Sequence, residues 1–166
     1  AKSFSVAGVK TVLVDADLNK ASLTSRLDLQ DTAGLRDAIA DGALDRSGQV
    51  RALGQLDMLP VGRDSMVSDE HLSLPRVRTV MEDLRSAYQL VVIDAGTTED
   101  NLSASLVTAL SDQVAVIVRA GERASDCRRA LKRLELHTVR PPLLVFNDAM
   151  NSDPGLDLTG PERGRT

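Results

Sequence analysis

Aromatic residues and cysteine are scarce in this sequence. Its 166 residues include no Trp, one Tyr, two Phe and one Cys, and aromatic residues make up 2% of the chain. Few aromatic side chains are available for bases to stack on, and basic residues are not in excess, so direct nucleic-acid binding is not expected. The lone cysteine, Cys127, cannot form a disulfide within the chain, which is typical of proteins from a reducing, cytoplasmic compartment.

Long apolar runs are also missing, and the charge is mildly acidic. Nothing approaches the ~18 consecutive apolar residues of a membrane-spanning helix, and the formal net charge is -4. What the chain does contain is Val, Leu, Ile and Ala in short runs, the composition of a sheet buried on both faces. A chain of this length can form one domain that buries about two-thirds of its unfolded surface. We expect that domain over residues 1–150 and a disordered tail over 151–166, where Asp, Gly, Pro and Arg dominate.

Apolar runs and helical patterns alternate along the chain. This alternation predicts a three-layer α/β/α fold with a mostly parallel sheet and right-handed crossovers. One of the helices is expected to carry an apolar stripe of Val77, Val80, Met81 and Leu84, with Pro75 in its first turn. The expected strands are 12–15, 56–62, 90–94, 113–118 and 143–146, and the expected helices are 22–27, 34–40, 75–88, 102–110 and 126–136.

Acidic residues follow two of these strands. Asp15 and Asp17 come at the end of the first strand, and Asp94 ends the strand that begins at Leu90. Ligands of open parallel sheets bind outside the carboxyl ends of the strands, so these carboxylates predict a cation and phosphate site. The alternative is that each Asp caps a helix or orders a loop, and an Asn such as Asn147 after the last strand is often a turn residue.

The order of several segments resembles a known family. Val12-Leu13-Val14-Asp15-Ala16-Asp17-Leu18 resembles the second nucleotide motif, Walker A-prime, of the bacterial tyrosine autokinases that regulate capsule and exopolysaccharide synthesis. The later matching segments are Met58 to Gly62, Tyr88 to Asp94, Val116 to Gly121 and Val145 to Asp148. The same combination is similar to the wider group of deviant P-loop ATPases, which includes partitioning and septum-site proteins.

The resemblance implies a role for each acidic residue. Asp94 would hold Mg²⁺ through water as the Walker B residue, Asp15 would share in the metal shell, and Asp15 and Asp17 would orient the acceptor hydroxyl. Asn147 occupies the position that reads the adenine edge of ATP, which suits an amide that both donates and accepts hydrogen bonds. The implied function of the intact protein is that of an ATP-dependent protein-tyrosine kinase, a transferase that regulates polysaccharide chain length.

The resemblance also implies partners and a location. These are a membrane polysaccharide co-polymerase segment or adaptor, a homo-oligomer, and a cytoplasmic position at the inner face of the bacterial membrane.

The phosphate-binding half of the expected site is not in this sequence. No segment reads Gly-x-x-x-x-Gly-Lys-Ser/Thr, and Gly8-Val9-Lys10-Thr11 leads straight into a strand. By resemblance, the residues before Lys10 match the end of the helix that follows the P-loop. We therefore expect the N-terminal strand and P-loop to lie upstream, two strand edges to be left unpaired, and this chain alone to be inactive.

Other departures from the family leave different functions open. Asn19 replaces a usual Arg, Ala95-Gly96-Thr97 replaces a segment that usually contains Pro, and the tail has no tyrosine cluster. The alternatives are a degenerate, non-catalytic ATPase-like interaction module, a partitioning-type ATPase, and a receiver domain that accepts a phosphoryl group on Asp. The basic residues between Arg123 and Arg133 could contact an acidic partner, or they could form an ordinary solvated helix face.

Overall fold

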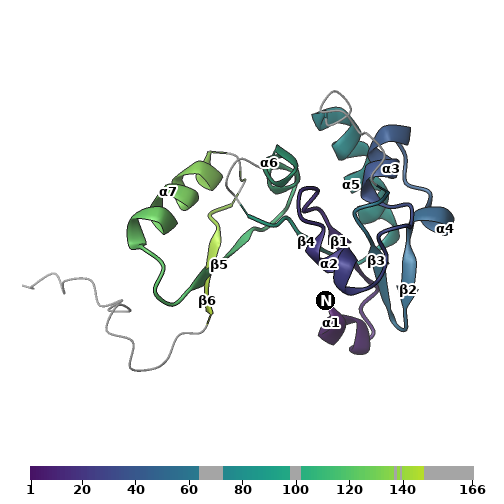
Figure 1. The fold of residues 1–166 in the computed structure, drawn as a ribbon, viewed down its shortest axis with the longest axis horizontal. Helices are drawn as coiled ribbons and strands as arrows, with labels where there is room; N and C mark the ends of the chain where they lie inside the picture. The colour runs from purple at the N-terminus through teal and green to yellow at the C-terminus, as the bar shows by residue number, and fades with distance from the viewer. Residues whose placement is uncertain (64–72, 98–101, 137, 139, 148–166) are drawn as a thin grey trace, which may run out of the picture. The chain divides into compact units, whose positions relative to one another are not determined.

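The structure is a computed structural model that describes residues 1–63, 73–97, 102–136, 138 and 140–147 (Figure 1). The chain divides into two compact units, Ala1–Ser111 and Asp112–Thr166, each considered by itself below. The predicted domain over residues 1–150 stays a prediction, and the predicted tail lies outside the described residues.

The first unit contains most of the regular structure. Its helices are α1 (Lys2–Val6), α2 (Ser22–Arg26), α3 (Leu35–Asp41), α4 (Arg46–Gln49), α5 (Leu74–Ala87) and α6 (Leu102–Ala109). Its strands are β1 (Thr11–Asp15), β2 (Arg51–Leu53), β3 (Leu56–Leu59) and β4 (Leu90–Asp94).

The strands of this unit form a mostly parallel sheet, as predicted, in the order β2-β3-β1-β4. β1 pairs in parallel with both β3 and β4, whereas β2 runs antiparallel to β3. Strand β2 and helix α4 were not predicted, because both are too short to show an apolar period. Gly54, with φ +68°, lies in the turn that reverses the chain from β2 into β3. Within the described residues, β4 is an edge strand of this sheet.

The core of the first unit lies around β1 and α5. Val12 and Val14 of β1 are buried, and so are Val77, Val80, Met81 and Leu84, which confirms the apolar stripe predicted for α5. Pro75 is in the first turn of α5, where its missing N–H leaves no helical hydrogen bond unmade.

The N-terminus of α3 is docked on the exit of β3. The amides of Leu35 and Arg36 donate to the carbonyls of Pro60 and Val61 at 2.8 Å each. A Cβ on Gly34 would lie 2.2 Å from the Pro60 carbonyl oxygen, so only glycine permits this approach. The contact holds the loop after β3 beside the edge of the sheet where β1 also ends.

The second unit is smaller. It consists of β5 (Ala115–Arg119), α7 (Ala124–Glu135) and β6 (Leu143–Asn147), with β5 and β6 paired in parallel. The helix begins two residues before the predicted start at residue 126, and β5 is shifted by one or two residues from the expected 113–118. Every residue of β6 is exposed, and Ile117 of β5 is 67% exposed.

Candidate functional site

The predicted acidic residues of the first unit meet at one edge of its sheet. In the parallel pairing of β1 with β4, Asp15 stands opposite Asp94, so both strands end at the same level. The backbone amide of Ala16 then donates to the carbonyl of Asp94 at 2.8 Å, which ties the two strand exits together. The carboxyl-end edge predicted from the sequence is therefore present in the structure.

Asp15 is the most constrained of these residues, since none of its surface is exposed. Its Oδ2 accepts hydrogen bonds from the amide and the hydroxyl of Thr24, both at 2.8 Å, and its Oδ1 accepts from the Asp17 amide at 3.2 Å. The N-cap of α2 is Ala21, which has no side-chain acceptor for the orphan amides of the first turn. Asp15 therefore supplies, from β1, the acceptor that the local sequence of α2 lacks.

Thr24 is a site residue that the sequence analysis missed. Its side chain is 1% exposed, and its hydroxyl both donates to Asp15 and accepts from the Val61 amide at 3.0 Å. One hydroxyl thus joins β1, α2 and the loop after β3. No local pattern marks a threonine for this role, because its partners are nine and 37 positions away.

Gly96 brings Asp17 and Asp94 together. Its amide donates to Asp94 Oδ1 at 3.1 Å, and a Cβ placed on it would lie 2.5 Å from both Cγ and Oδ2 of Asp17. With φ +69°, Gly96 also adopts a backbone conformation that other residues adopt only with strain. In the sequence, this segment stands out only as a departure from a family pattern. The structure shows that glycine is needed here for the carboxylate of Asp17 to fit.

The remaining carboxylate atoms indicate what the site can hold. Asp17 is 5% exposed and accepts from the Lys20 amide at 3.3 Å, whereas Asp94 is exposed to solvent. Across the described part of the chain, no three His, Cys, Asp or Glu side chains gather as a metal-binding group. Mg²⁺ commonly uses only one or two protein carboxylates and keeps water and phosphate ligands, so the exposed carboxylate of Asp94 is compatible with Mg²⁺, whereas both oxygens of Asp15 already accept hydrogen bonds.

The other predicted binding residue belongs to the second unit. Asn147 is the last residue of β6, and its carbonyl accepts from the Ala120 amide at 3.0 Å. Its proposed role in reading adenine stays a prediction. In the first unit, Gly8 to Thr11 leads directly from α1 into β1, as the sequence analysis expected of a segment that is not a P-loop.

Comparison with known proteins gives two curated relatives. The succinoglycan biosynthesis transport protein ExoP of Rhizobium meliloti (strain 1021) is 29% identical over 132 residues, which are 77% of this chain and 17% of ExoP. The putative tyrosine-protein kinase EpsB of Ralstonia nicotianae is 27% identical over 143 residues, 84% of this chain and 19% of EpsB. The chain thus spans less than a fifth of the length of these relatives. No protein-family profile matches it.

Solved structures show the same fold. The VpsO kinase domain has a TM-score of 0.76 at 22% identity, over 89% of this chain and 74% of that domain. The kinase domain of the Escherichia coli tyrosine kinase ETK has a TM-score of 0.75 at 20% identity, over 87% of this chain and 57% of that domain. A ParA family ATPase from Chlorobium tepidum has a TM-score of 0.65 at 18% identity, over 88% of this chain and 65% of that protein.

These likenesses confirm the predicted α/β fold with a mostly parallel sheet, which the chain shares with the VpsO and ETK kinase domains and the ParA family ATPase. The family resemblance indicated by the motif order agrees with these comparisons, since the chain is similar in sequence to ExoP and EpsB and in fold to the kinase domains of VpsO and ETK.

Proposed function

We propose that this chain is part of the nucleotide-binding domain of a protein-tyrosine autokinase-like regulator of exopolysaccharide or capsule synthesis, which uses Mg-ATP in the intact protein. The observation that carries the proposal is the joint end of β1 and β4, where Asp15, Asp17 and Asp94 lie at one edge of a parallel sheet. The match to ExoP and EpsB over most of the chain supports the same assignment.

In the proposed phosphoryl transfer, each of these residues has a separate role. When bound, Mg²⁺ would neutralise the negative charge that develops on the transferred phosphoryl group. Asp94 is the exposed carboxylate and would hold the ion through water, while Asp17, packed against Gly96, would orient the acceptor hydroxyl. Asp15 would contribute to the metal shell and to catalysis chiefly by keeping the end of β1 rigid, since both of its oxygens already accept hydrogen bonds.

The acceptor tyrosine must come from elsewhere than the described core. Tyr88 is the one tyrosine of the sequence. It is 6% exposed, and its hydroxyl donates to Asp57 Oδ2 at 2.8 Å. Burial and this hydrogen bond to Asp57 raise the pKa of Tyr88 above its usual value. A buried, protonated hydroxyl is a poor nucleophile, so the proposed reaction acts on another polypeptide or on a segment outside this chain.

The proposal includes partners and a location. None of the helices that the structure describes is both long and apolar enough to cross a bilayer. By the resemblance, a membrane polysaccharide co-polymerase segment or adaptor would connect the domain to the inner face of the membrane, with ATP and further copies of the domain as the other partners. Asn147 would read the adenine edge.

The test is calorimetric titration of Mg-ATP into this chain and into a version extended upstream through the strand and loop that the resemblance places there. We expect the extended protein to bind, with Asp94→Asn weakening the metal-dependent part of binding. Asp31→Asn, at an exposed position of the same unit, removes the same charge and should leave binding unchanged. Tyrosine kinase activity on an added tyrosine-containing peptide should fail with Asp94→Ala while the fold is retained.

One observation favours a second function, a non-catalytic interaction module. The buried Asp15 has both oxygens occupied by internal donors, as in an aspartate kept only for structure. If neither protein bound Mg-ATP and both unfolded cooperatively, the interaction module would replace the kinase. If Asp94→Asn left metal-dependent turnover intact, the proposed site would be wrong.

A further inference from the structure

Helix α7 of the second unit has two opposite faces. Leu134 is buried at 7% exposure, and Cys127, Ala130 and Leu131 on the same side are partly buried. The positions that lie opposite on a helix of 3.6 residues per turn are all exposed. They are Ser125, Arg128, Arg129, Lys132, Arg133 and Leu136, and together they line a shallow hollow of about 400 Å³. These six residues are called the basic face below.

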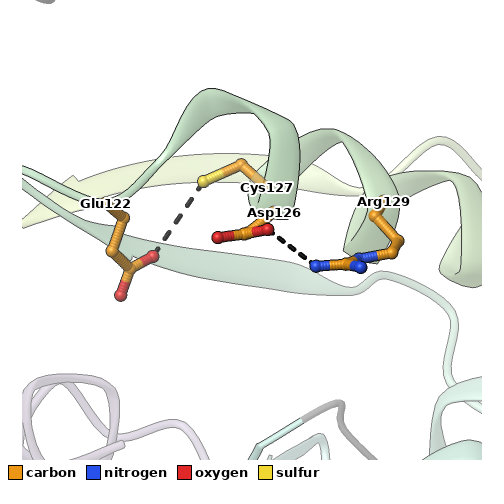
Figure 2. Close-up of polar contacts among 4 residues, drawn as sticks. All are labelled: Glu122, Asp126, Cys127 and Arg129. Atoms are coloured by element: carbon orange, nitrogen blue, oxygen red, sulfur yellow. Dashed lines mark hydrogen bonds and ion pairs between the residues drawn. The ribbon is translucent and has the colours of Figure 1, made fainter.

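The cations of the basic face have few partners among the described residues. Arg129 pairs with Asp126 at 2.7 Å, but this pair lies at the surface, with side chains 69% and 49% exposed. Figure 2 shows the pair beside the contact of Cys127 with Glu122, both toward the N-terminal end of α7. Arg128, Lys132 and Arg133 make no hydrogen bond or ion pair to any residue that the structure describes.

Such an arrangement has a cost within the helix. Like charges four positions apart repel, and both Arg128 with Lys132 and Arg129 with Arg133 have this spacing. Attraction of the last-turn cations to the carbonyl end of the helix offsets part of the repulsion. The chain as a whole carries a net charge of -4, so the concentration of positive charge is local to this face.

Leu136 indicates which polyanion suits the face. It is 80% exposed, although it lies in line with the cations. A phosphate backbone offers nothing apolar to a leucine, whereas the boundary between lipid headgroups and acyl chains does. The hollow is shallow and bounded by long side chains of a single helix, which suits a surface of many phosphates better than one fixed anion. An anionic bilayer attracts each nearby Lys or Arg by about 1 kcal/mol, roughly a fivefold gain in binding.

We propose that the basic face of α7 is a contact surface for anionic phospholipid headgroups, with Leu136 entering the interfacial layer. The proposal does not depend on nucleotide binding. The two can therefore fail separately.

The test is flotation of the whole chain with vesicles of phosphatidylcholine alone or mixed with phosphatidylglycerol, at low and high salt. We expect binding to the anionic vesicles alone, and its loss at high salt. The triple change Arg128→Gln, Lys132→Gln and Arg133→Gln should weaken binding by roughly a hundredfold, at about fivefold for each charge. The matched control, Lys2→Gln, Arg26→Gln and Arg78→Gln, removes the same charge from exposed positions of the first unit and should change binding several-fold at most.

Two further comparisons separate lipid from other partners. Leu136→Asn should weaken vesicle binding but leave binding to duplex DNA or heparin unchanged, and circular dichroism checks that each variant stays folded. Failure to bind anionic vesicles, or equal losses in the two triple variants, would overturn the proposal. Tighter binding to duplex DNA than to vesicles, with no effect of Leu136→Asn on vesicle binding, would assign the face to nucleic acid instead.

Discussion

The two units of the chain differ in how far their parallel strands are buried. In the first unit, Val12 and Val14 of the central strand β1 are at most 1% exposed, and α5 contributes four buried apolar residues to the same core. In the second unit, Leu143 to Phe146 of β6 are each at least 42% exposed. Parallel strands are normally covered on both faces. The difference teaches that the first unit makes its own core, whereas the described residues of the second unit cover only part of theirs.

Separating the units gives the largest expected effect. A fragment of residues 1–111 should unfold cooperatively in urea, because its core cluster is complete within it. A fragment of residues 112–166 should show little stable structure, because a sheet of two strands is marginal by itself. Circular dichroism during urea titration measures both. A cooperative transition in the smaller fragment would show that the second unit also folds by itself, which would contradict the expected difference between the two units.

Truncating one leucine in each unit makes the same comparison within the intact chain. Leu84→Ala removes a side chain with no exposed surface and should lower the free energy of unfolding by about 2–5 kcal/mol. Leu144→Ala, at 42% exposure, should lower it by less than about 1 kcal/mol. Urea titration of both variants gives the difference. Equal losses would mean that β6 is packed in solution.

Thr24→Val tests how tightly the end of β1 is held. Valine keeps the shape but removes the hydroxyl, which leaves the Val61 amide without its acceptor and takes one donor from Asp15. A buried group left unsatisfied costs about 1–3 kcal/mol, and urea titration should show a loss of that size. Thr24→Ser keeps the hydroxyl and should lower the free energy of unfolding by less than Thr24→Val does. If both variants were equally stable, the hydroxyl would not hold the site.

A pair of glycines separates backbone strain from contact with the site. Gly96 and Gly121 both have positive φ, +69° and +87°, so alanine at either should cost about 1–2 kcal/mol of strain. Nothing lies within 4 Å of a Cβ at Gly121, whereas one at Gly96 meets Asp17. Gly96→Ala should therefore be the more destabilising in urea titration, and it alone should weaken Mg-ATP binding by the extended protein. Identical behaviour of the two variants would remove Gly96 from the site.

The smallest expected effect is a pH dependence confined to the first unit. The pKa of Tyr88 is raised from 10.0 by burial and by its hydrogen bond to Asp57. The folded state then holds this proton more tightly than the unfolded state. The resulting contribution of Tyr88 to the free energy of unfolding is complete below pH 10 and is lost as pH rises through the folded pKa. Unfolding free energies measured from pH 9 upward should fall in the natural chain more than in Tyr88→Phe. Parallel pH profiles would contradict the assigned shift.

Most of the fold could be predicted because its signals are local. The runs that became β1, β4 and α5 are long or periodic enough to identify, and Gly42 ends α3 with φ +71°, as expected of a helix stop. Strand β2 and helix α4 were missed because three or four residues carry no period. The antiparallel pairing of β2 depends on a neighbour brought beside it by the turn at Gly54.

The candidate site could be predicted only in part. Carboxylates at strand ends are visible in the sequence, and the parallel pairing of β1 with β4 places Asp15 opposite Asp94 as expected. The roles of Thr24 and Gly96 were not visible. A hydroxyl that joins three segments and a glycine that admits a carboxylate are defined by atoms distant in the chain.

The sequence by itself determined the fold class, the order of the longer strands and helices and the acidic residues at the strand ends, because apolar period and turn residues act over a few positions. Only the tertiary structure decided that Asp15 is an internal anchor, that Asp17 and Asp94 share Gly96, and that the cations of α7 stand on the face opposite Leu134. Burial and hydrogen bonding are set by groups that meet only once the chain has folded.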